Sequence, residues 1–204
     1  MGAREHWNAV YEEQPTTLLG WYEPEPSTLA LVIEYSTPLS SVIDIGGGDS
    51  RLVDELLLRD YGELTVLDLS EVALDRVRSR LGDRADEVDW VVTDLTSFEP
   101  ARTWDLWHDR AVFHFLVNAA DQETYRALAA KAIRPGGYLI VAAFGTDGPV
   151  ECAGLPVCRY DTESLPALFT PQFEPVWSGP LAAVSADRGD QRPYVAAVLR
   201  RTTV

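Results

Sequence analysis

The sequence predicts an α/β fold with a parallel, doubly wound sheet, and three observations support this prediction. Short runs rich in β-branched and apolar residues alternate with stretches in which apolar residues recur at helical spacing. These runs return at regular intervals from Ser41 onward, as expected when helices connect parallel strands. Polar residues follow several runs, and ligands of such sheets bind at the carboxyl ends of strands. The chain has 204 residues, which predicts a single domain, 1–204.

The first predicted strand, 41–45, ends in a glycine turn that precedes a helix. The three glycines are consecutive: Gly46, Gly47 and Gly48. Glycines allow a ligand to lie against the backbone, where a Cβ would collide with it. Asp49 and Ser50 are both good helix N-cap residues, and an apolar helical pattern follows over 51–59. Asp44 lies just before the turn, where it suits a partner with positive charge or hydroxyl donors.

The spacing of the glycines restricts the kind of nucleotide. A dinucleotide fingerprint starting at Gly46 needs glycine at position 51, where the chain has Arg51. A phosphate loop needs lysine after the glycines, and none follows. The remaining pattern, D-x-G-x-G, is the first motif of class I S-adenosylmethionine methyltransferases. The alternative is a glycine turn that binds no ligand.

Acidic residues also follow the second and third predicted strands. Asp68 comes after 64–67, and Asp94 comes after 88–92. Asp68 is placed to accept two hydrogen bonds from a ribose diol, although it could instead be a loop aspartate that contacts only water. Asp94 is placed to accept a hydrogen bond from an adenine amino group.

The rest of the chain continues the alternation. A fourth strand is predicted over 103–107, a helix capped by Asp121 follows, and a fifth strand covers 138–144. A long loop, 145–160, leads to two final strands at 173–177 and 194–200.

Three residues after the fourth strand are candidate proton acceptors for a methyl acceptor that enters protonated: His108, Asp109 and His114. Each has a structural alternative. His108 could contact a cofactor through its backbone alone, and His114 could pack on the sheet. Asp109 could form an ion pair with Arg110 that shapes the loop.

The N-terminal segment, 1–26, is rich in aromatic residues. Trp7 and Tyr11 are spaced to share one helical face, and Trp21 precedes a turn-rich stretch. Two interpretations remain open, a lid over the strand ends and a helix packed on the core. We expect the sheet-and-helix core to cover 27–204.

Composition narrows the partners. The formal net charge is −15, which disfavours a nucleic acid partner. Neither a charged-then-apolar leader nor an apolar run of membrane-spanning length is present in the sequence, so we expect a cytoplasmic protein with no membrane partner. Cys152 and Cys158 are expected to be free thiols, and the histidines lack zinc-ligand spacing, so no metal is expected. Nothing in the sequence indicates an oligomeric state.

At this point the chain resembles the seven-stranded class I methyltransferases over nearly its whole length. The resemblance rests on four stretches: 44–48, 66–70, 92–95 and 134–139. More narrowly, the chain is similar to small bacterial members related to protein-lysine and thiopurine methyltransferases, through 6–11, 21–22, 107–111 and 152–157. It departs from the family at Ser50, where many members carry a third glycine. It also departs over 182–193, which lacks the narrower group's His and Thr-Pro pattern.

The resemblance implies a mostly parallel seven-stranded sheet, with helices on both faces and an antiparallel hairpin at one edge. It also implies S-adenosylmethionine as the cofactor, with Trp7 and Trp21 lying over it. The residues expected to hold the cofactor are Trp7, Trp21, Asp44, Gly46, Gly47, Gly48, Asp68, Leu69, Asp94, Leu95 and His108.

Three functions are consistent with the sequence. The first is in-line methyl transfer to an oxygen, nitrogen or sulfur atom of a small molecule. The second is methylation of a protein lysine, since a surface of charge −15 attracts basic segments. The third is binding of an adenosyl ligand without catalysis.

Overall fold

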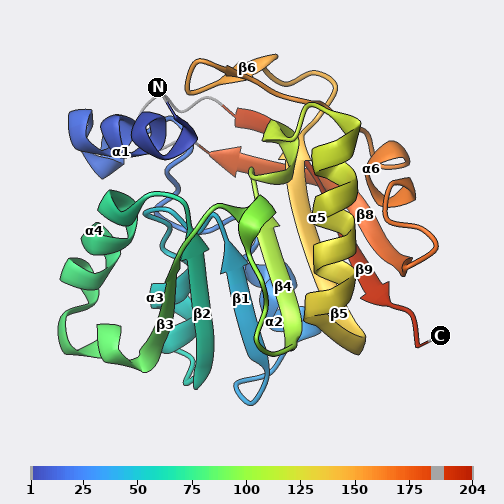
Figure 1. Cartoon of the computed structure of the whole chain (residues 1–204), viewed down its shortest axis with the longest axis horizontal. Helices are drawn as coiled ribbons and strands as arrows, with labels where there is room; N and C mark the ends of the chain where they lie inside the picture. Colours follow the sequence, from blue (N-terminus) through green and yellow to red (C-terminus); the bar gives the residue numbers. More distant parts are fainter. Residues whose placement is uncertain (1, 185–190, 204) are drawn as a thin grey trace.

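The computed structural model describes residues 2–184 and 191–203, and it contains a seven-stranded sheet in the order β3-β2-β1-β4-β5-β9-β8. Its strands are β1 (Ser41–Ile45), β2 (Glu63–Asp68), β3 (Val88–Val92), β4 (Trp104–Arg110), β5 (Ile133–Phe144), β8 (Phe173–Val184) and β9 (Gln191–Arg201). The first five strands are parallel, β9 pairs antiparallel with β5 at one side, and β8 pairs antiparallel with β9 at the edge (Figure 1). The predicted fold class is confirmed.

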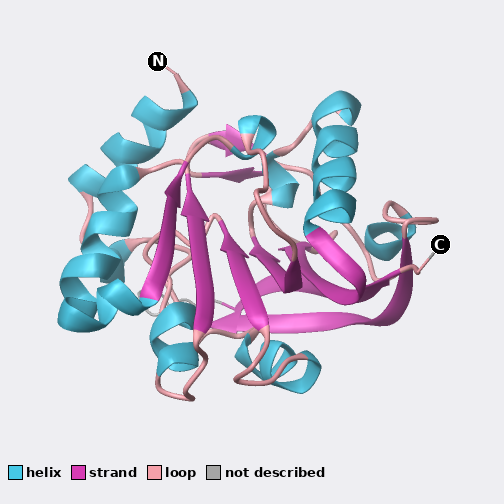
Figure 2. Ribbon diagram, turned by 60° about the horizontal axis from the view of Figure 1, so that its bottom comes forward, coloured by secondary structure: helices cyan, strands magenta, loops and turns pink. Residues whose placement is uncertain are grey.

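Helices cover both faces of this sheet (Figure 2). They are α1 (Ala3–Glu13), α2 (Leu29–Tyr35), α3 (Leu52–Leu57), α4 (Glu71–Leu81), α5 (Ala119–Ala132) and α6 (Ser164–Ala167). Short 3₁₀ helices lie at Thr16–Leu18, Gly82–Glu87, Leu95–Ser97 and Phe113–Phe115. The helices α2, α3 and α4 pack on one face, whereas α5 and α6 pack on the other.

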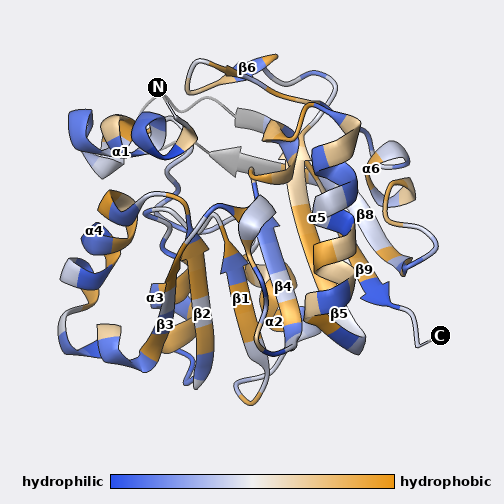
Figure 3. Cartoon of the chain, in the orientation of Figure 1, coloured by the Kyte–Doolittle hydropathy of each residue, from blue (hydrophilic) through white to orange (hydrophobic). Residues whose placement is uncertain are grey.

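The alternation of side chains along each strand produces these two cores. Val42 and Leu106 belong to the cluster under α2, α3 and α4, whereas Ile43 and Trp107 belong to the cluster under α5 and α6. Both faces of the strands are therefore apolar, which is visible as orange strands at the centre of Figure 3. Each large side chain buried in this way contributes roughly 1.5–3 kcal/mol.

Several predicted boundaries are wrong, and β5, for example, begins at Ile133 and not at residue 138. The fourth strand does not end at residue 107, because β4 continues to Arg110 beside β5. The cap of α5 is Asn118 and not Asp121: the side chain of Asn118 accepts a hydrogen bond from the backbone N–H of Asp121 at 2.9 Å. Asp121 lies in the first turn, where its charge suits the helix dipole.

The segment after β5 contains more structure than the sequence indicated. The loop 145–160 includes a small antiparallel hairpin, β6 (Glu151–Cys152) paired with β7 (Leu155–Pro156). Strands β8 and β9 both exceed their predicted lengths. The connection at 185–190 lies outside the described residues, and half of the family departure over 182–193 falls there.

The N-terminal segment packs on α4. Tyr11, Leu19 and Ala73 are buried together, with Trp7 and Trp21 packed against them. The hydroxyl of Ser70, which caps α4, donates to the side-chain oxygen of Asn8 at 2.8 Å. Figure 1 shows α1 on the side of the sheet toward which the arrowheads of β1, β2 and β4 point.

Candidate functional site

A cavity of about 320 Å³ lies at the carboxyl ends of β1, β2 and β4. This volume is within the range of pockets for cofactors and small ligands. The helix α1 and the β6–β7 hairpin both contribute residues to its wall, and both lie beyond the strand ends in Figure 1. The lining includes ten of the eleven residues expected to hold a cofactor: Trp7, Trp21, Asp44, Gly46, Gly47, Asp68, Leu69, Asp94, Leu95 and His108. Gly48 is the eleventh and is not part of the described lining.

The glycine turn is packed too tightly for side chains. A Cβ on Gly46 would lie 2.0 Å from Cγ2 of Val112, and one on Gly47 would lie 2.5 Å from Cγ1 of Val66. Gly46 also has a φ of +60°, in the left-handed region that favours glycine. The backbone of the turn can therefore form part of the cavity wall only with glycine at these positions.

Asp68 is held rigidly at the tip of β2. Its two carboxylate oxygens accept backbone hydrogen bonds from Gly48 at 2.8 Å and from Ser70 at 2.7 Å. The residue is only 8% exposed, and this burial raises the pKa of the carboxyl group to about 6. Each oxygen retains a further lone pair for a ligand hydroxyl.

Asp44 is held by a histidine from the neighbouring strand. Nδ1 of His108 lies 2.7 Å from Oδ1 of Asp44, and Nε2 lies 2.8 Å from the hydroxyl oxygen of Thr28. All three side chains are buried. Because both ring nitrogens have protein partners, the arrangement suits His108 to orienting Asp44 at the cavity wall.

Aromatic rings form the wall near α1. The ring centroid of Trp7 lies 5.8 Å from that of Trp21 and 5.2 Å from that of Phe115, both in edge-to-face geometry. All three residues line the cavity. The N-terminal segment thus both packs on the protein and encloses the cavity.

Comparisons with known proteins agree with this geometry. Residues 43–139 match the sequence family described as "Methyltransferase domain". The N-methyltransferase NodS from Bradyrhizobium japonicum, solved with S-adenosyl-L-homocysteine, is 18% identical with a TM-score of 0.69, over 96% of this chain and 98% of that one. This chain therefore contains a region similar to a methyltransferase domain, on a fold that it shares with an S-adenosyl-L-homocysteine-bound N-methyltransferase.

Two further relatives represent different acceptors. The 1,6-didemethyltoxoflavin-N1-methyltransferase of Burkholderia thailandensis is 20% identical with a TM-score of 0.68, over 98% of this chain and 84% of that one. The eEF1A lysine and N-terminal methyltransferase of Mus musculus is 24% identical over 126 residues, which are 61% of this chain. The chain spans only 18% of the length of the mouse protein.

Two of the residues expected to take a proton lie outside the described lining of the cavity. Asp109 is fully buried, and its carboxylate accepts hydrogen bonds from the backbone N–H of Val112 at 2.9 Å and from the hydroxyl of Tyr125 at 2.7 Å. His114 is also fully buried, with its ring centroid 4.7 Å from that of Phe144. Neither residue is part of the described lining, and their catalytic role stays a prediction.

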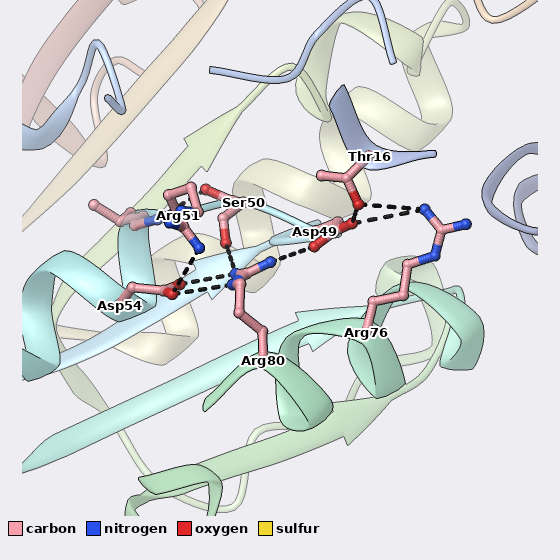
Figure 4. Close-up of polar contacts among 8 residues, drawn as sticks. Thr16, Asp49, Ser50, Arg51, Asp54, Arg76 and Arg80 are labelled. Carbon is pink, nitrogen blue, oxygen red and sulfur yellow. Dashed lines mark hydrogen bonds and ion pairs between the residues drawn. The ribbon is translucent and has the colours of Figure 1, made fainter. Parts of the chain in front are cut away.

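An ionic cluster that the sequence did not reveal holds the glycine turn (Figure 4). Asp49 is 4% exposed and, instead of capping α3, it pairs with Arg80 and Arg76 from α4. The hydroxyl of Thr16 also donates to Asp49. Arg76 donates to the backbone oxygen of Gln14 at 2.9 Å. One carboxylate thereby connects the turn, α4 and the N-terminal segment.

Two charged residues of the cavity were also missed. The sequence suggested an ion pair between Asp109 and Arg110, but Arg110 pairs with Glu23, and both of these side chains line the cavity. Cys152 and Leu155 of the β6–β7 hairpin line it as well. These residues join the wall through contacts between distant parts of the chain, for which the local pattern gives no signal.

Cys152 is buried and Cys158 is half-buried, and no disulfide joins them. Within residues 2–184 and 191–203, no group of three or more His, Cys, Asp or Glu side chains is arranged to hold a metal ion. In the same ranges, every helix is too short or too polar to cross a membrane.

Proposed function

We propose that this protein transfers the methyl group of S-adenosylmethionine to an oxygen, nitrogen or sulfur atom of a small molecule. The observation that carries the proposal is the convergence of the glycine turn, Asp68 and Asp94 in one cavity. Each of them was expected from the sequence to contact a different part of an adenosyl ligand.

The residues present fit this cofactor. The glycine turn provides a backbone surface whose position a Cβ at Gly46 or Gly47 would disturb, because it would collide with Val112 or Val66. Asp68 would accept from the ribose hydroxyls, and Asp94 with Leu95 would contact the adenine. Asp44 would accept from the ammonium group. When bound, the cofactor supplies the methyl group as an electrophile on a positively charged sulfur.

The chain's own residues have three tasks in this reaction: to align the acceptor, to exclude water and to surround positive charge. Trp7 and Trp21 are placed to surround the positive charge, through cation–π attraction of about 0.5–2 kcal/mol. Such attraction accelerates the reaction only by the difference between ground and transition state. His108 acts as the residue that positions Asp44, because its ring nitrogens are both engaged.

A small acceptor fits the cavity better than a protein does. Trp7, Phe115 and Leu155 give it apolar walls, and α1 and the β6–β7 hairpin both cover the strand ends. The structural relative from Burkholderia was solved with the small molecule 1,6-didemethyltoxoflavin bound. We infer that the segment 1–26 acts as a lid over cofactor and acceptor.

Lysine methylation is the second candidate. It is favoured by the match to the mouse eEF1A methyltransferase and by the net charge of −15, which attracts basic segments. Incubation with methyl-labelled cofactor and cell extract, followed by separation of small molecules from protein, distinguishes the candidates. Label in the small-molecule fraction supports the proposal, and label in protein supports the second candidate. If no methyl group is transferred, the result supports binding of an adenosyl ligand without catalysis.

We also propose that the protein works in the cytoplasm without nucleic acid or membrane partners. The two cysteines, which no disulfide joins, and the acidic composition support this. Alkylation of protein purified without reductant should modify both cysteines, and an intermolecular or intramolecular disulfide would contradict the location.

Substitution of Asp68 should weaken cofactor binding. In Asp68→Ala, S-adenosylhomocysteine loses charge-assisted hydrogen bonds to its ribose, which costs about 1–3 kcal/mol. Asp94→Ala should cost less, because a single neutral contact to adenine is lost. Calorimetric titration measures both. If both variants bind as the parent does, the assignment of Asp68 to the ribose and of Asp94 to the adenine is wrong.

The same aspartate should make binding depend on pH. Ribose hydroxyls favour the ionised carboxylate, whose pKa in the ligand-free protein is about 6. Affinity should therefore fall about fourfold between pH 7.5 and pH 5.5, as the ionised fraction falls. The stability of the ligand-free protein should change with pH in the opposite direction. Because burial raises the pKa of Asp68 above its value in the unfolded chain, protonation of Asp68 stabilises the folded protein as the pH falls through 6. Asp68→Asn should bind weakly at both pH values without this change.

A further inference from the structure

Tyr11 is the residue through which the N-terminal segment touches the glycine turn. A Cβ on Gly48 would lie 2.3 Å from the hydroxyl oxygen of Tyr11, so this oxygen packs directly against the backbone of Gly48. Gly48 also has a φ of +52°, which favours glycine. Tyr11 is part of the described cavity lining, whereas Gly48 is not. The side chain of Tyr11 therefore covers this end of the turn.

Arg76 of α4 holds the same tyrosine by its backbone. Nη2 of Arg76 donates to the backbone oxygen of Tyr11 and, at 2.9 Å, to that of Gln14. Both oxygens lie at the end of α1, where helix carbonyls lack partners within the helix. The guanidinium also lies 5.9 Å from the ring centroid of Tyr11. One arginine from a neighbouring helix therefore fixes the end of α1.

Asp49 joins this contact to the glycine turn. It directly follows the three glycines, its side chain is only 2% exposed, and its Oδ2 lies 3.7 Å from Nη1 of Arg76. The hydroxyl of Thr16 donates to the same oxygen, and Figure 4 shows Thr16 and Arg76 converging on Asp49. Arg80 pairs with the other carboxylate oxygen and donates to the backbone oxygen of Ser50 at 2.6 Å. The buried charge of Asp49 is thus shared between an arginine that fixes the turn and an arginine that fixes the lid.

The position of Tyr11 also determines the position of Trp7. The two residues are one turn apart on α1, and their ring centroids are 6.5 Å apart. Both line the cavity, where Trp7 lies beside Trp21. A shift at the end of α1 would therefore move the aromatic wall. Arg76, which is not part of the described lining, can affect ligand binding without touching the ligand.

We propose that Arg76 is a positioning residue that holds the lid closed, by fixing Tyr11 against Gly48 and by pairing with Asp49. The inference rests on the proposed function and deepens it, because it assigns a means of closure to the lid over cofactor and acceptor. When Arg76 is removed, α1 leaves the glycine turn while the core of the sheet stays folded. Accessibility of α1 and affinity for the ligand then change together.

Limited proteolysis of the full chain with a glutamate-specific protease tests the closure without any ligand. The helix α1 contains Glu5, Glu12 and Glu13, and a protease cuts a helix only after local opening. In Arg76→Met, cleavage within α1 should be about 10-fold faster or more, because charged hydrogen bonds are lost and cleavage follows the open population. Affinity for S-adenosylhomocysteine, measured by calorimetry, should fall roughly 3- to 10-fold, in proportion to the closed fraction.

Arg78→Met is the matched control. Arg78 lies on the same helix and pairs with Asp75 of that helix at 2.7 Å, so its loss removes the same charge and leaves the lid in place. This variant should show the cleavage rate and the affinity of the parent. Thermal melting and the masses of the first products distinguish local opening from general unfolding. If Arg76→Met does not melt cooperatively, Thr16→Val takes its place, because it breaks the contact with Asp49 from the side of the lid.

A double-mutant cycle with Trp7→Ala distinguishes a positioning role from a merely structural one. Because Arg76 acts through the lid, the separate affinity losses of Arg76→Met and Trp7→Ala should together exceed the loss in the double variant. Parental cleavage in a folded Arg76→Met, equal acceleration in Arg78→Met, or fully additive losses would overturn the inference. A parent protein that does not bind S-adenosylhomocysteine would refute the proposed function, and the cleavage rates would still test the closure.

Discussion

Gly46→Ala is expected to abolish binding of S-adenosylhomocysteine and to lower the free energy of unfolding by roughly 2–5 kcal/mol. The added Cβ would lie 2.0 Å from Cγ2 of Val112, and alanine is strained at the φ of +60° that Gly46 adopts. The turn or Val112 must move, and either change alters the cavity wall. Calorimetric titration and urea denaturation measure the two effects.

Gly82→Ala separates backbone strain from collision. Gly82 ends α4 with a φ of +59°, but a Cβ there would meet no atom within 4 Å. This variant should lose about 1–2 kcal/mol of stability and bind S-adenosylhomocysteine as the parent does. If Gly46→Ala were to behave like Gly82→Ala, the close packing of the glycine turn would not matter for binding.

Removal of residues 1–22 is the second change with a large expected effect. The truncated protein should fold, because the clusters on both faces of the sheet consist of residues from Leu29 onward. It should lose cofactor affinity and most turnover, since Trp7, Tyr11 and Trp21 leave together. Its melting temperature should also be lower, because Ala73 and Arg76 lose partners in this segment.

Thermal melts with and without S-adenosylhomocysteine decide between a lid and simple core packing. A lid predicts a cooperative melt that the ligand no longer raises. Core packing alone predicts an unfolded product, and a truncated protein that keeps its full ligand-induced stabilisation would exclude a lid. Trp7→Ala and Trp177→Ala form a matched pair, because Trp177 lies exposed on β8 away from the cavity lining. Only the first should weaken binding.

The elements of the fold that could be predicted are those that leave a pattern in a short stretch of sequence. The periodicity of apolar residues located the strands, and glycine spacing located the turn. Asp68 and Asp94 were recognised as site candidates because residues at the tips of parallel strands converge regardless of what lies between them. Both line the cavity.

Missed features depend on contacts between distant segments. Asp49 looked like a helix cap, but its partners, Arg76 and Arg80, are one helix further along the chain. Asp109 was expected to accept a proton, and its burial and its hydrogen bond from Tyr125 have no signal in the local sequence. No local rule distinguishes a carboxylate that faces a cavity from one that faces the core, because consecutive strand residues point to opposite sides.

Arg110 illustrates the same limit. Next to Asp109 in the sequence, it suggested a local ion pair, yet the two side chains leave β4 in opposite directions. Arg110 therefore meets Glu23 and the cavity, whereas Asp109 meets the core. The two-residue strands of the β6–β7 hairpin were also beyond prediction, since so short a run has no recognisable period.

The most direct test of the central claim is a calorimetric comparison of ligands on the parent protein. S-Adenosylmethionine and S-adenosylhomocysteine should each bind at one site per chain, and NAD and NADP should show no saturable binding under the same conditions. The reason is Arg51, which stands where a dinucleotide fingerprint requires glycine, together with the acidic cavity, which repels a pyrophosphate. Tighter binding of NAD or NADP than of S-adenosylmethionine would contradict the account.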